Sequence, residues 1–178
     1  MDEKTCIAVF GGGCFWCTEA VFERLRGVVS VKPGYAGGTL PNPTYRQVCT
    51  GGTGHAEVVR VEYNPVRITY KDLLTVFFAT HDPTTLNRQG ADVGPEYRSI
   101  ILYTSADQQR EAEEFIKNLA ATYPGNSIVT EITPLKEFYE AEDYHHEYFR
   151  NNELAPYCQY VIHPKVEKVN DKFSTLLK

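Results

Sequence analysis

Three consecutive glycines followed by a cysteine limit most strongly what the N-terminal part of this chain can form. Residues 11–17 read Gly-Gly-Gly-Cys-Phe-Trp-Cys and follow an apolar run at residues 6–10 that has the length of a buried strand. The apolar side chains of the next segment, residues 18–25, have helical spacing. Because glycine tolerates sharp changes of chain direction, the sequence predicts a strand, a tight turn and a helix, with Cys14 at the corner.

A cysteine at the start of a helix is a candidate nucleophile. A thiol reacts as its thiolate, and the free N–H groups and partial positive charge of a helix N-terminus stabilise that anion. We therefore expect a lowered pKa for Cys14. Two other interpretations stay open: Cys14 and Cys17 are buried apolar residues, or they form half of a zinc site. A zinc site would need a second ligand pair at short spacing, and the sequence offers none.

Composition favours a soluble globular protein with one domain over residues 1–178. The chain is 42% hydrophobic, which is enough for a substantial core. We expect a C-terminal tail, from about residue 150, to pack back onto this domain. The 18 basic and 23 acidic residues give a formal charge of −5 without a basic stripe, so nucleic acid is not an expected partner.

The N-terminus and the cysteines indicate a cellular setting. The charged first residues are followed by an apolar run too short for a signal peptide or a membrane span. We therefore expect a cytoplasmic protein that does not associate with membranes, and a monomer. In a reducing compartment, five cysteines indicate chemistry or packing rather than structural disulfides.

The order of periodic segments predicts an α+β fold. Strand patterns occur at residues 28–35, 55–63, 98–103 and 128–132, and helical patterns occur at 45–49, 69–81 and 106–123. We expect a two-layer α/β sandwich with a ferredoxin-like core, a mixed sheet and long loops. In the strand at 55–63, alternation places Glu57 on the same face as Val59 and Val61. Its carboxyl group would therefore lie on an otherwise apolar face.

Seven short motifs together resemble a known family. In sequence order they are Gly-Cys-Phe-Trp at 13–16, Gly-Tyr-Ala-Gly-Gly at 34–38, Asn-Pro-Thr-Tyr at 42–45, Gly-His-Ala-Glu at 54–57, His-Asp-Pro-Thr at 81–84, Arg-Gln-Gly-Ala-Asp at 88–92 and Tyr-Arg-Ser at 97–99. Over roughly residues 5–150 the chain resembles peptide methionine sulfoxide reductase A. The Gly-Cys-Phe-Trp motif is highly specific for that family.

The resemblance implies a catalytic role for Cys14 and three helpers. The Cys14 thiolate would attack the sulfur of free or peptide-bound methionine S-sulfoxide, which leaves methionine and a sulfenic acid. A sulfoxide oxygen leaves poorly unless it is protonated or strongly hydrogen-bonded. The matching residues are Glu57 as the acid, with a pKa raised by burial, and Tyr45 and Tyr97 as donors. The alternative role for Glu57 is a salt bridge to an arginine.

The resemblance also implies a binding pocket. Phe15 and Trp16 would enclose the S-methyl group, and Asp92 would accept a hydrogen bond from the backbone N–H of the substrate methionine. The simpler alternatives are two core aromatic residues and a solvated or capping aspartate. For Tyr144 and His145 we expect packing or hydrogen bonding near the pocket.

Two cysteines are candidates to resolve the sulfenic acid. In a helical turn the Cα atom of Cys17 lies about 5 Å from that of Cys14, within reach of a disulfide. Many members of the family keep a resolving cysteine where Cys158 stands, and many have glycine in place of Cys17. We favour Cys158, because a C-terminal tail can move toward Cys14 after methionine leaves. For Cys6 and Cys49 we expect packing roles.

The resemblance implies that thioredoxin, and no metal, flavin or nicotinamide, completes the cycle. Thioredoxin would reduce the intramolecular disulfide, and the expected partners are thioredoxin, oxidised proteins and free methionine S-sulfoxide. Two other functions remain open from the residues themselves. One is a thioredoxin-like dithiol–disulfide oxidoreductase that uses Cys14 and Cys17, and the other is a non-enzymatic metal-binding module.

Overall fold

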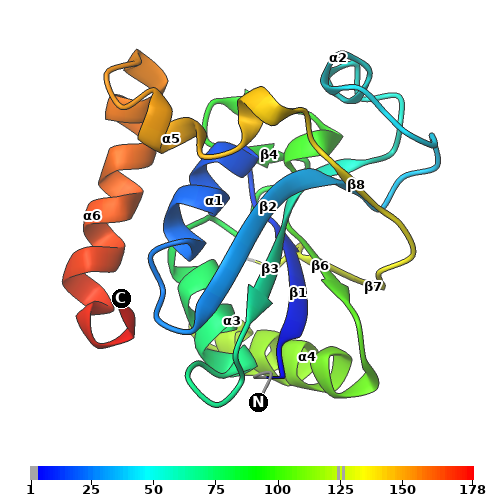
Figure 1. The fold of residues 1–178 in the computed structure, drawn as a ribbon. Coiled ribbons are helices and arrows are strands. Elements are labelled where there is room, and N and C mark those ends of the chain that lie inside the picture. Colours follow the sequence, from blue (N-terminus) through cyan, green and yellow to red (C-terminus); the bar gives the residue numbers. More distant parts are fainter. Residues whose placement is uncertain (1–3, 124, 126) are drawn as a thin grey trace.

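A mixed sheet forms the centre of the structure. The computed structural model describes residues 4–123, 125 and 127–178, and Figure 1 shows the elements of this part of the chain. Six strands follow the order β7-β6-β1-β3-β2-β8, and every neighbouring pair is antiparallel except β6 with β7. Their bounds are β1 Cys6–Gly11, β2 Val28–Ala36, β3 Ala56–Tyr63, β6 Ile100–Tyr103, β7 Glu131–Pro134 and β8 Phe138–Glu140. The mixed sheet predicted from the sequence is confirmed.

Helices fill the connections between the strands. The α-helices are α1 Phe15–Phe22, α2 Tyr45–Cys49, α3 Tyr70–Ala79, α4 Ala106–Ala120, α5 Tyr148–Asn151 and α6 His163–Lys172. Shorter elements are the 3₁₀ turns η1 Pro95–Tyr97, η2 Asp143–His145 and η4 Ser174–Leu176, the π-helical turn η3 Cys158–Ile162, and a small hairpin of β4 Arg88–Gln89 and β5 Asp92–Val93. Thr44 and Thr69 close capping boxes at the starts of α2 and α3, close to the starts that the sequence predicts.

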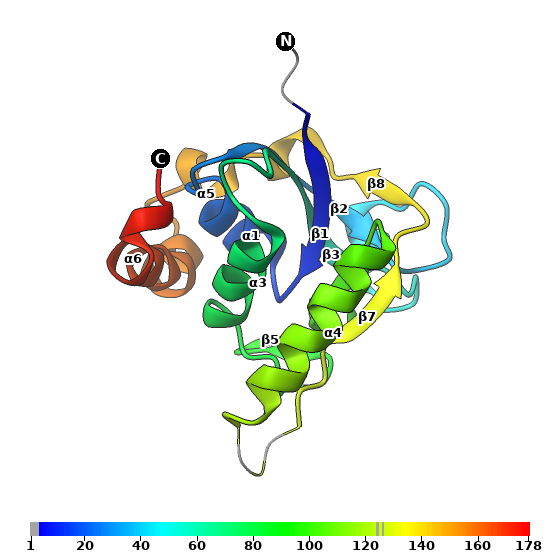
Figure 2. The same ribbon diagram turned by 90° about the horizontal axis from the view of Figure 1, so that it is seen from below.

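The helices lie mainly on one face of the sheet. Helix α1 packs on β2 and β3, and α4 packs on β6, β7 and α3. Between the layers, the ring of Phe10 stacks on Phe22 and Phe77, with centroids 5.3 and 5.0 Å apart. The other face carries a smaller apolar cluster, against which Leu135 and Phe138 pack. Figure 2 shows α6 on the side of α1 that faces away from the sheet.

The antiparallel topology gathers four chain segments at one edge of the sheet. Gly11 at the end of β1 pairs with Ile100 at the start of β6, and Ala36 at the end of β2 pairs with Ala56 at the start of β3. Because β1 and β3 are antiparallel neighbours, these four strand ends meet. The segments that carry the predicted site residues leave or enter the sheet here.

The turn between β1 and α1 depends on its glycines. A Cβ atom at Gly11 would lie 2.8 Å from the carbonyl oxygen of Glu57, so only glycine lets the two backbones approach this closely. Gly13 has a φ of +92°, in the left-handed region that side chains disfavour. The predicted strand, turn and helix are therefore confirmed, with Cys14 at the corner.

The C-terminal segment is helical and packs against α1. Cys158, Ile162, Val166 and Val169 are buried in the main core. The predicted return of the tail onto the rest of the fold is confirmed, and it occurs through helices α5 and α6. Within the described residues, no helix is long and apolar enough to cross a membrane.

Replacing Gly13 with alanine should destabilise the protein more than replacing Gly90. Both glycines have positive φ, 92° and 58°. A Cβ atom at Gly13 would lie 2.7 Å from Cγ of Gln89, whereas at Gly90 no described atom lies within 4 Å. We expect Gly90→Ala to lower the free energy of unfolding by about 1–2 kcal/mol through backbone strain. Gly13→Ala should lower it by about 1–3 kcal/mol more through the clash. Urea unfolding measures both, and equal losses would contradict the steric argument.

Candidate active site

Cys14 stands directly before the first residue of α1. Its backbone is extended, with φ −63° and ψ 131°, and its carbonyl oxygen accepts a hydrogen bond from the N–H of Cys17 at 3.0 Å. The side chain is 7% exposed. The thiol is therefore largely buried rather than on the open surface.

Glu57 is buried beside Cys14. Its Oε1 atom accepts a hydrogen bond from the backbone N–H of Phe15 at 3.2 Å, and its Oε2 atom is buried without a hydrogen-bond partner among the described residues. Burial raises the pKa of this carboxyl from 4.5 to about 8. The raised pKa predicted from the sequence is confirmed, so Glu57 holds a proton at neutral pH.

The predicted lowered pKa of Cys14 is wrong. Burial raises the pKa of this thiol well above its ordinary value, and the charges of Glu57 and Cys17 raise it further. A hydrogen bond from the backbone N–H of Trp16 lowers the pKa, as a helix start should. This effect is smaller than that of burial, so Cys14 is a thiol at neutral pH before substrate arrives.

Aromatic rings surround the thiol. The ring of Phe15 is fully buried, with its centroid 5.0 Å from that of His145 and 6.3 Å from that of Tyr45. Trp16 is partly exposed and stacks face to face on Tyr148 at 3.7 Å. Phe15 and Trp16, both predicted pocket residues, therefore lie at one site with two rings from the C-terminal half of the chain.

His145 is held in one neutral form. Its Nδ1 atom accepts a hydrogen bond from Nε1 of Trp16 at 3.0 Å, so the ring proton is on Nε2. Burial lowers the pKa of His145, and its Nε2 atom has no hydrogen-bond partner among the described residues. The hydrogen-bonding role expected for His145 is confirmed, whereas Tyr144 is 61% exposed.

Tyr45 is the first residue of α2, and Tyr97 is the last residue of the turn η1. Glu142 positions Tyr45, because it accepts hydrogen bonds from the hydroxyl of Tyr35 at 2.9 Å and from the backbone N–H of Tyr45 at 3.1 Å. Burial raises the pKa of both Tyr45 and Tyr97, and the charge of Glu57 raises it further. Both hydroxyls therefore stay protonated and can donate hydrogen bonds near Glu57.

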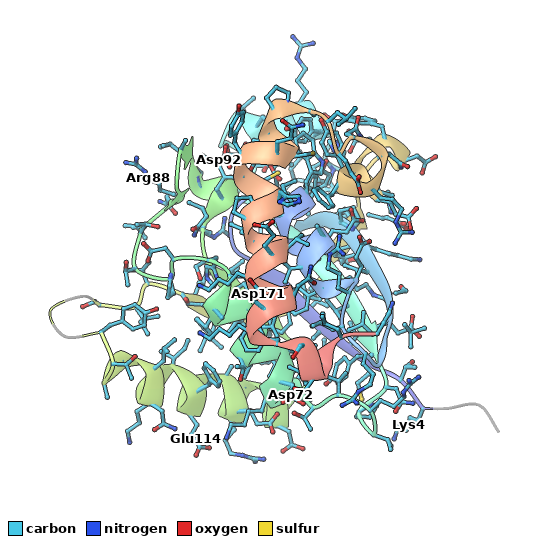
Figure 3. All side chains as sticks on the ribbon, turned by 90° about the vertical axis from the view of Figure 1, so that its left-hand side faces the viewer. Lys4, Asp72, Arg88, Asp92, Glu114 and Asp171 are labelled. Atoms are coloured by element: carbon cyan, nitrogen blue, oxygen red, sulfur yellow. The ribbon has the colours of Figure 1, made fainter. Side chains whose placement is uncertain are left out.

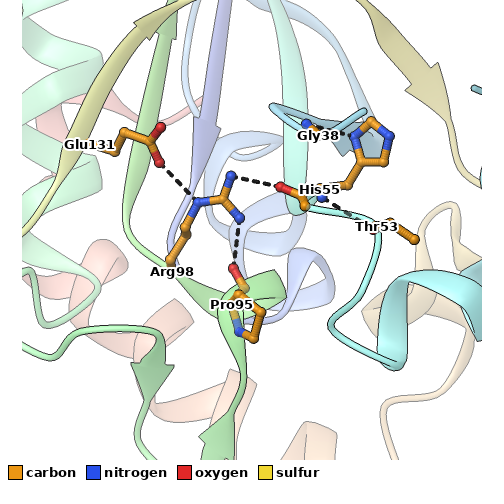
Figure 4. Close-up of polar contacts among 7 residues, drawn as sticks. Gly38, Thr53, His55, Pro95, Arg98 and Glu131 are labelled. Atoms are coloured by element: carbon orange, nitrogen blue, oxygen red, sulfur yellow. Dashed lines mark hydrogen bonds and ion pairs between the residues drawn. The ribbon is translucent and has the colours of Figure 1, made fainter. Parts of the chain in front are cut away.

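Hydrogen bonds to Arg98 and His55 hold these loops in place. The Arg98 guanidinium donates to the carbonyl oxygens of Gly54 and Pro95, both at 2.9 Å, and pairs with Glu131 at 3.0 Å (Figure 4). It thus joins the residues before β3 to the turn η1. His55 accepts a hydrogen bond from the N–H of Gly38 at 3.0 Å. The segment just before Glu57 is therefore tied both to η1 and to the residues that follow β2.

Asp92 contacts a residue that the sequence did not single out. The hydroxyl of Tyr157 donates to Oδ2 of Asp92 at 2.7 Å and lies 3.6 Å from Sγ of Cys17. The Tyr157 ring also contacts Trp16 edge-on at 5.9 Å. Asp92 lies beside the first turns of the C-terminal helical segment (Figure 3). The one sequence signal for Tyr157 is its position next to Cys158.

The described structure contains five free cysteines with different surroundings. Cys6 packs against the core, as expected. Cys49 is exposed, and its thiol hydrogen-bonds to Tyr45, so the expected packing role for Cys49 is wrong. Cys158 is fully buried at the start of η3, where burial and then the charge of Cys17 raise its pKa. It lies in a packed helical segment rather than in an extended tail.

Glu19 anchors the C-terminal segment to α1. Its carboxyl group is 2% exposed and accepts hydrogen bonds from the N–H groups of Glu147 at 3.0 Å and Tyr148 at 3.3 Å. Glu147 has a φ of +52°, a left-handed turn that directs both N–H groups to one acceptor. Glu19 therefore fixes the position of Tyr148, which stacks on Trp16.

A thiol, a buried carboxyl group that holds a proton, and an aromatic pocket define a thiol-dependent oxidoreductase. Comparison with known proteins gives the family. The family model described as "Peptide methionine sulfoxide reductase" matches residues 6–177. The chain belongs to the peptide methionine sulfoxide reductase family, as its resemblance predicted.

Individual relatives agree with this assignment. A "Peptide methionine sulfoxide reductase MsrA" from Sulfolobus acidocaldarius is 59% identical over 167 residues, which cover 94% of each chain. The reduced form of Mxr1 from Saccharomyces cerevisiae has a TM-score of 0.80 and 37% identity, covering 89% of this chain and 91% of Mxr1. Mxr1 in complex with Trx2 has a TM-score of 0.58 and 29% identity over 83% of this chain and 87% of that one.

Substitution of Glu57 by glutamine should change how stability depends on pH. Because the pKa of Glu57 is about 8 in the folded protein and ordinarily 4.5, the folded chain keeps a proton that the unfolded chain releases between these values. Stability is therefore lost as pH rises from about 4.5 to 8. The Glu57→Gln variant escapes this loss, so its stability relative to wild type should increase by about 2–4 kcal/mol between pH 5 and pH 9. Urea unfolding at both pH values measures the change, and a constant difference would contradict it.

Proposed function

We propose that the protein reduces free and peptide-bound methionine S-sulfoxide, with Cys14 as the nucleophile and Glu57 as the acid. The Glu57 carboxyl group carries this proposal. It is buried, has a pKa of about 8, and has an Oε2 atom without a partner among the described residues. A proton donor beside a thiol is what departure of the sulfoxide oxygen requires. Membership of the family supports the substrate class.

Glu57 can serve both proton transfers of the first step. As the sulfur of Cys14 attacks the substrate sulfur, Glu57 gives its proton to the sulfoxide oxygen and accepts the thiol proton of Cys14. The attack joins the two sulfur atoms only transiently: this bond and the S–O bond of the substrate then break while the oxygen forms a new bond to the sulfur of Cys14. Cys14 is thereby oxidised to a sulfenic acid, and methionine leaves as a thioether. The thiol need not be ionised beforehand, which agrees with the raised pKa of Cys14.

The other residues orient the sulfoxide. We assign the donor role to Tyr45 and Tyr97, because both hydroxyls stay protonated next to Glu57. Phe15 and Trp16 enclose the S-methyl group and exclude water. Burial of one methyl group contributes under about 1 kcal/mol to binding, but the two rings restrict the angle at which Cys14 attacks the sulfur. Asp92 binds the backbone N–H of the substrate through a carboxylate oxygen.

We propose Cys17 as the first thiol to attack the sulfenic acid. Cys17 is on the first turn of α1, and Tyr157 interacts with the thiols of both Cys14 and Cys17. Cys158 is buried in a packed helical segment, so it would have to leave the core to reach Cys14 first. We propose that Cys158, whose pKa is raised by burial and by the charge of Cys17, then accepts the disulfide from Cys17 by thiol–disulfide exchange.

An external dithiol completes the cycle, and we propose thioredoxin. The structural neighbour Mxr1 in complex with Trx2 supports this choice. The chemistry uses only thiols, a carboxyl group and tyrosine hydroxyls of this chain, without a prosthetic cofactor. A single catalytic domain over residues 1–178, a monomeric state and a cytoplasmic location remain predictions.

A Cys14→Ser variant should lose reduction of methionine S-sulfoxide entirely. A serine hydroxyl is far less acidic than a thiol and cannot form the sulfenic acid. The assay is release of methionine from N-acetyl-methionine S-sulfoxide with dithiothreitol as reductant. Cys6→Ser, which changes a partly buried thiol at the start of β1, is the matched control and should retain activity. Turnover by the Cys14→Ser variant would overturn the proposed function.

The disulfide formed after one turnover should join Cys14 to Cys17 in a Cys158→Ser variant. A Cys17→Ser variant should instead accumulate the Cys14 sulfenic acid, because Cys158 is held in the core. Mass mapping of alkylated peptides identifies each disulfide, and dimedone labels the sulfenic acid. Rapid formation of a Cys14–Cys158 disulfide in the Cys17→Ser variant would favour the earlier expectation that Cys158 resolves directly.

A further inference from the structure

One phenol hydroxyl connects the thiol of Cys17 to the carboxylate of Asp92. Tyr157 donates its only hydroxyl hydrogen to Oδ2 of Asp92 at 2.7 Å. The contact of 3.6 Å between Cys17 and Tyr157 therefore has the thiol as donor and the phenol oxygen as acceptor. We propose that Cys17, Tyr157 and Asp92 form a proton-transfer chain that activates Cys17 as the resolving thiol. This inference rests on the proposed function, in which Cys14 becomes a sulfenic acid.

The step balances without an outside oxidant. The S–H bond of Cys17 breaks as its sulfur attacks the sulfur of Cys14; its proton passes to Tyr157, whose own proton passes to Asp92. The S–O bond of Cys14 breaks, and the departing hydroxide takes the proton of Glu57 and leaves as water. Cys17 is oxidised and the sulfenic sulfur of Cys14 is reduced, giving one disulfide. Solvent afterwards removes the proton from Asp92 and returns one to Glu57.

The surroundings of Cys17 explain why it needs such a chain. Burial raises its pKa, the charges of Asp92 and Glu57 raise it further, and Lys165 of α6 lowers it. The thiol therefore keeps its proton at neutral pH. Uptake of that proton by Asp92 removes a negative charge that disfavours the thiolate. Other titratable groups nearby are Cys14, Cys158 and His81, which lines the same small cavity as Cys17 and Lys165.

Tyr157 is suited to pass a proton rather than to hold a charge. Burial raises its pKa far above the ordinary value, and the thiols of Cys14 and Cys17 contribute. When Tyr157 accepts the proton of Cys17, it must therefore give its own hydroxyl proton to Asp92 in the same step. The edge-on contact with Trp16 orients the Tyr157 ring. Cys17 belongs to α1, Asp92 belongs to β5, and Tyr157 directly precedes η3.

A Tyr157→Phe variant tests the chain in a single turnover. It keeps the ring on Trp16 and removes the hydroxyl. Reduced protein is mixed with excess N-acetyl-methionine S-sulfoxide without reductant, and methionine, sulfenic acid and disulfide are followed over time. The release of methionine should slow much less than disulfide formation, because Cys14 and Glu57 are intact and only the contact of Tyr157 with the Cys14 thiol is lost. Disulfide formation should slow by about 100-fold, the lower range for a positioned proton transfer, so sulfenic acid accumulates.

The pH profile and two further variants complete the experiment. In Tyr157→Phe the rate of disulfide formation should rise with pH as solvent takes the thiol proton, whereas the wild-type rate should change less. Tyr160→Phe removes a hydroxyl from a ring that is 80% exposed and should behave as wild type. The Asp92→Asn variant is assayed with methyl p-tolyl sulfoxide, which has no backbone N–H for Asp92 to bind. Disulfide formation in this variant should slow by a similar factor. It therefore provides a separate test if the Tyr157→Phe variant does not fold.

Two results would overturn the proton-transfer chain. One is disulfide formation at the wild-type rate in Tyr157→Phe and Asp92→Asn. The other is an equal slowing of the methionine burst and of disulfide formation in Tyr157→Phe, which would place Tyr157 in the first step. In either case, the rapid release of methionine would still require Cys14. A burst that persists in Cys14→Ser would instead show that the proposed function itself has failed.

Discussion

The hydrogen bond from the N–H of Phe15 to the buried carboxyl of Glu57 is the contact around which the site is built. It joins the first residue of α1 to β3, at the edge where four strand ends meet. A helix start has free N–H groups that need acceptors, and here a neutral acid supplies one. The helix terminus therefore fixes the proton donor beside Cys14, while burial keeps both groups protonated.

The C-terminal segment packs against the residues that follow Cys14 in α1. Glu19 holds its backbone at residues 147–148, which places Tyr148 on Trp16. Further along, Tyr157 lies against Asp92 and Cys17. One segment thus contacts both Trp16 and Cys17. Cys158, in the same segment, is buried against the core.

Local pattern was enough to predict much of the fold and part of the site. The strand at 55–63 and the glycine turn before Cys14 follow from short-range rules, because side-chain alternation and glycine φ values are properties of neighbouring residues. The raised pKa of Glu57 followed from its place on an apolar face. The pKa of Cys14 was predicted in the wrong direction, because the helix dipole is visible in sequence whereas burial depends on residues far along the chain. Tyr157 was missed for the same reason: it lies 65 residues from Asp92.

By itself, the sequence determined the family, the order of the main elements and the chemical types present: a thiol after three glycines, a carboxylic acid in an apolar strand, and tyrosines in loops. These are local properties, encoded by the spacing of a few residues. Only the tertiary structure decided which groups meet and in what protonation state. Contacts such as Trp16 with His145 and Cys17 with Tyr157 form between segments more than a hundred residues apart. Burial, which sets the pKa values, is a property of the whole packed chain rather than of any segment.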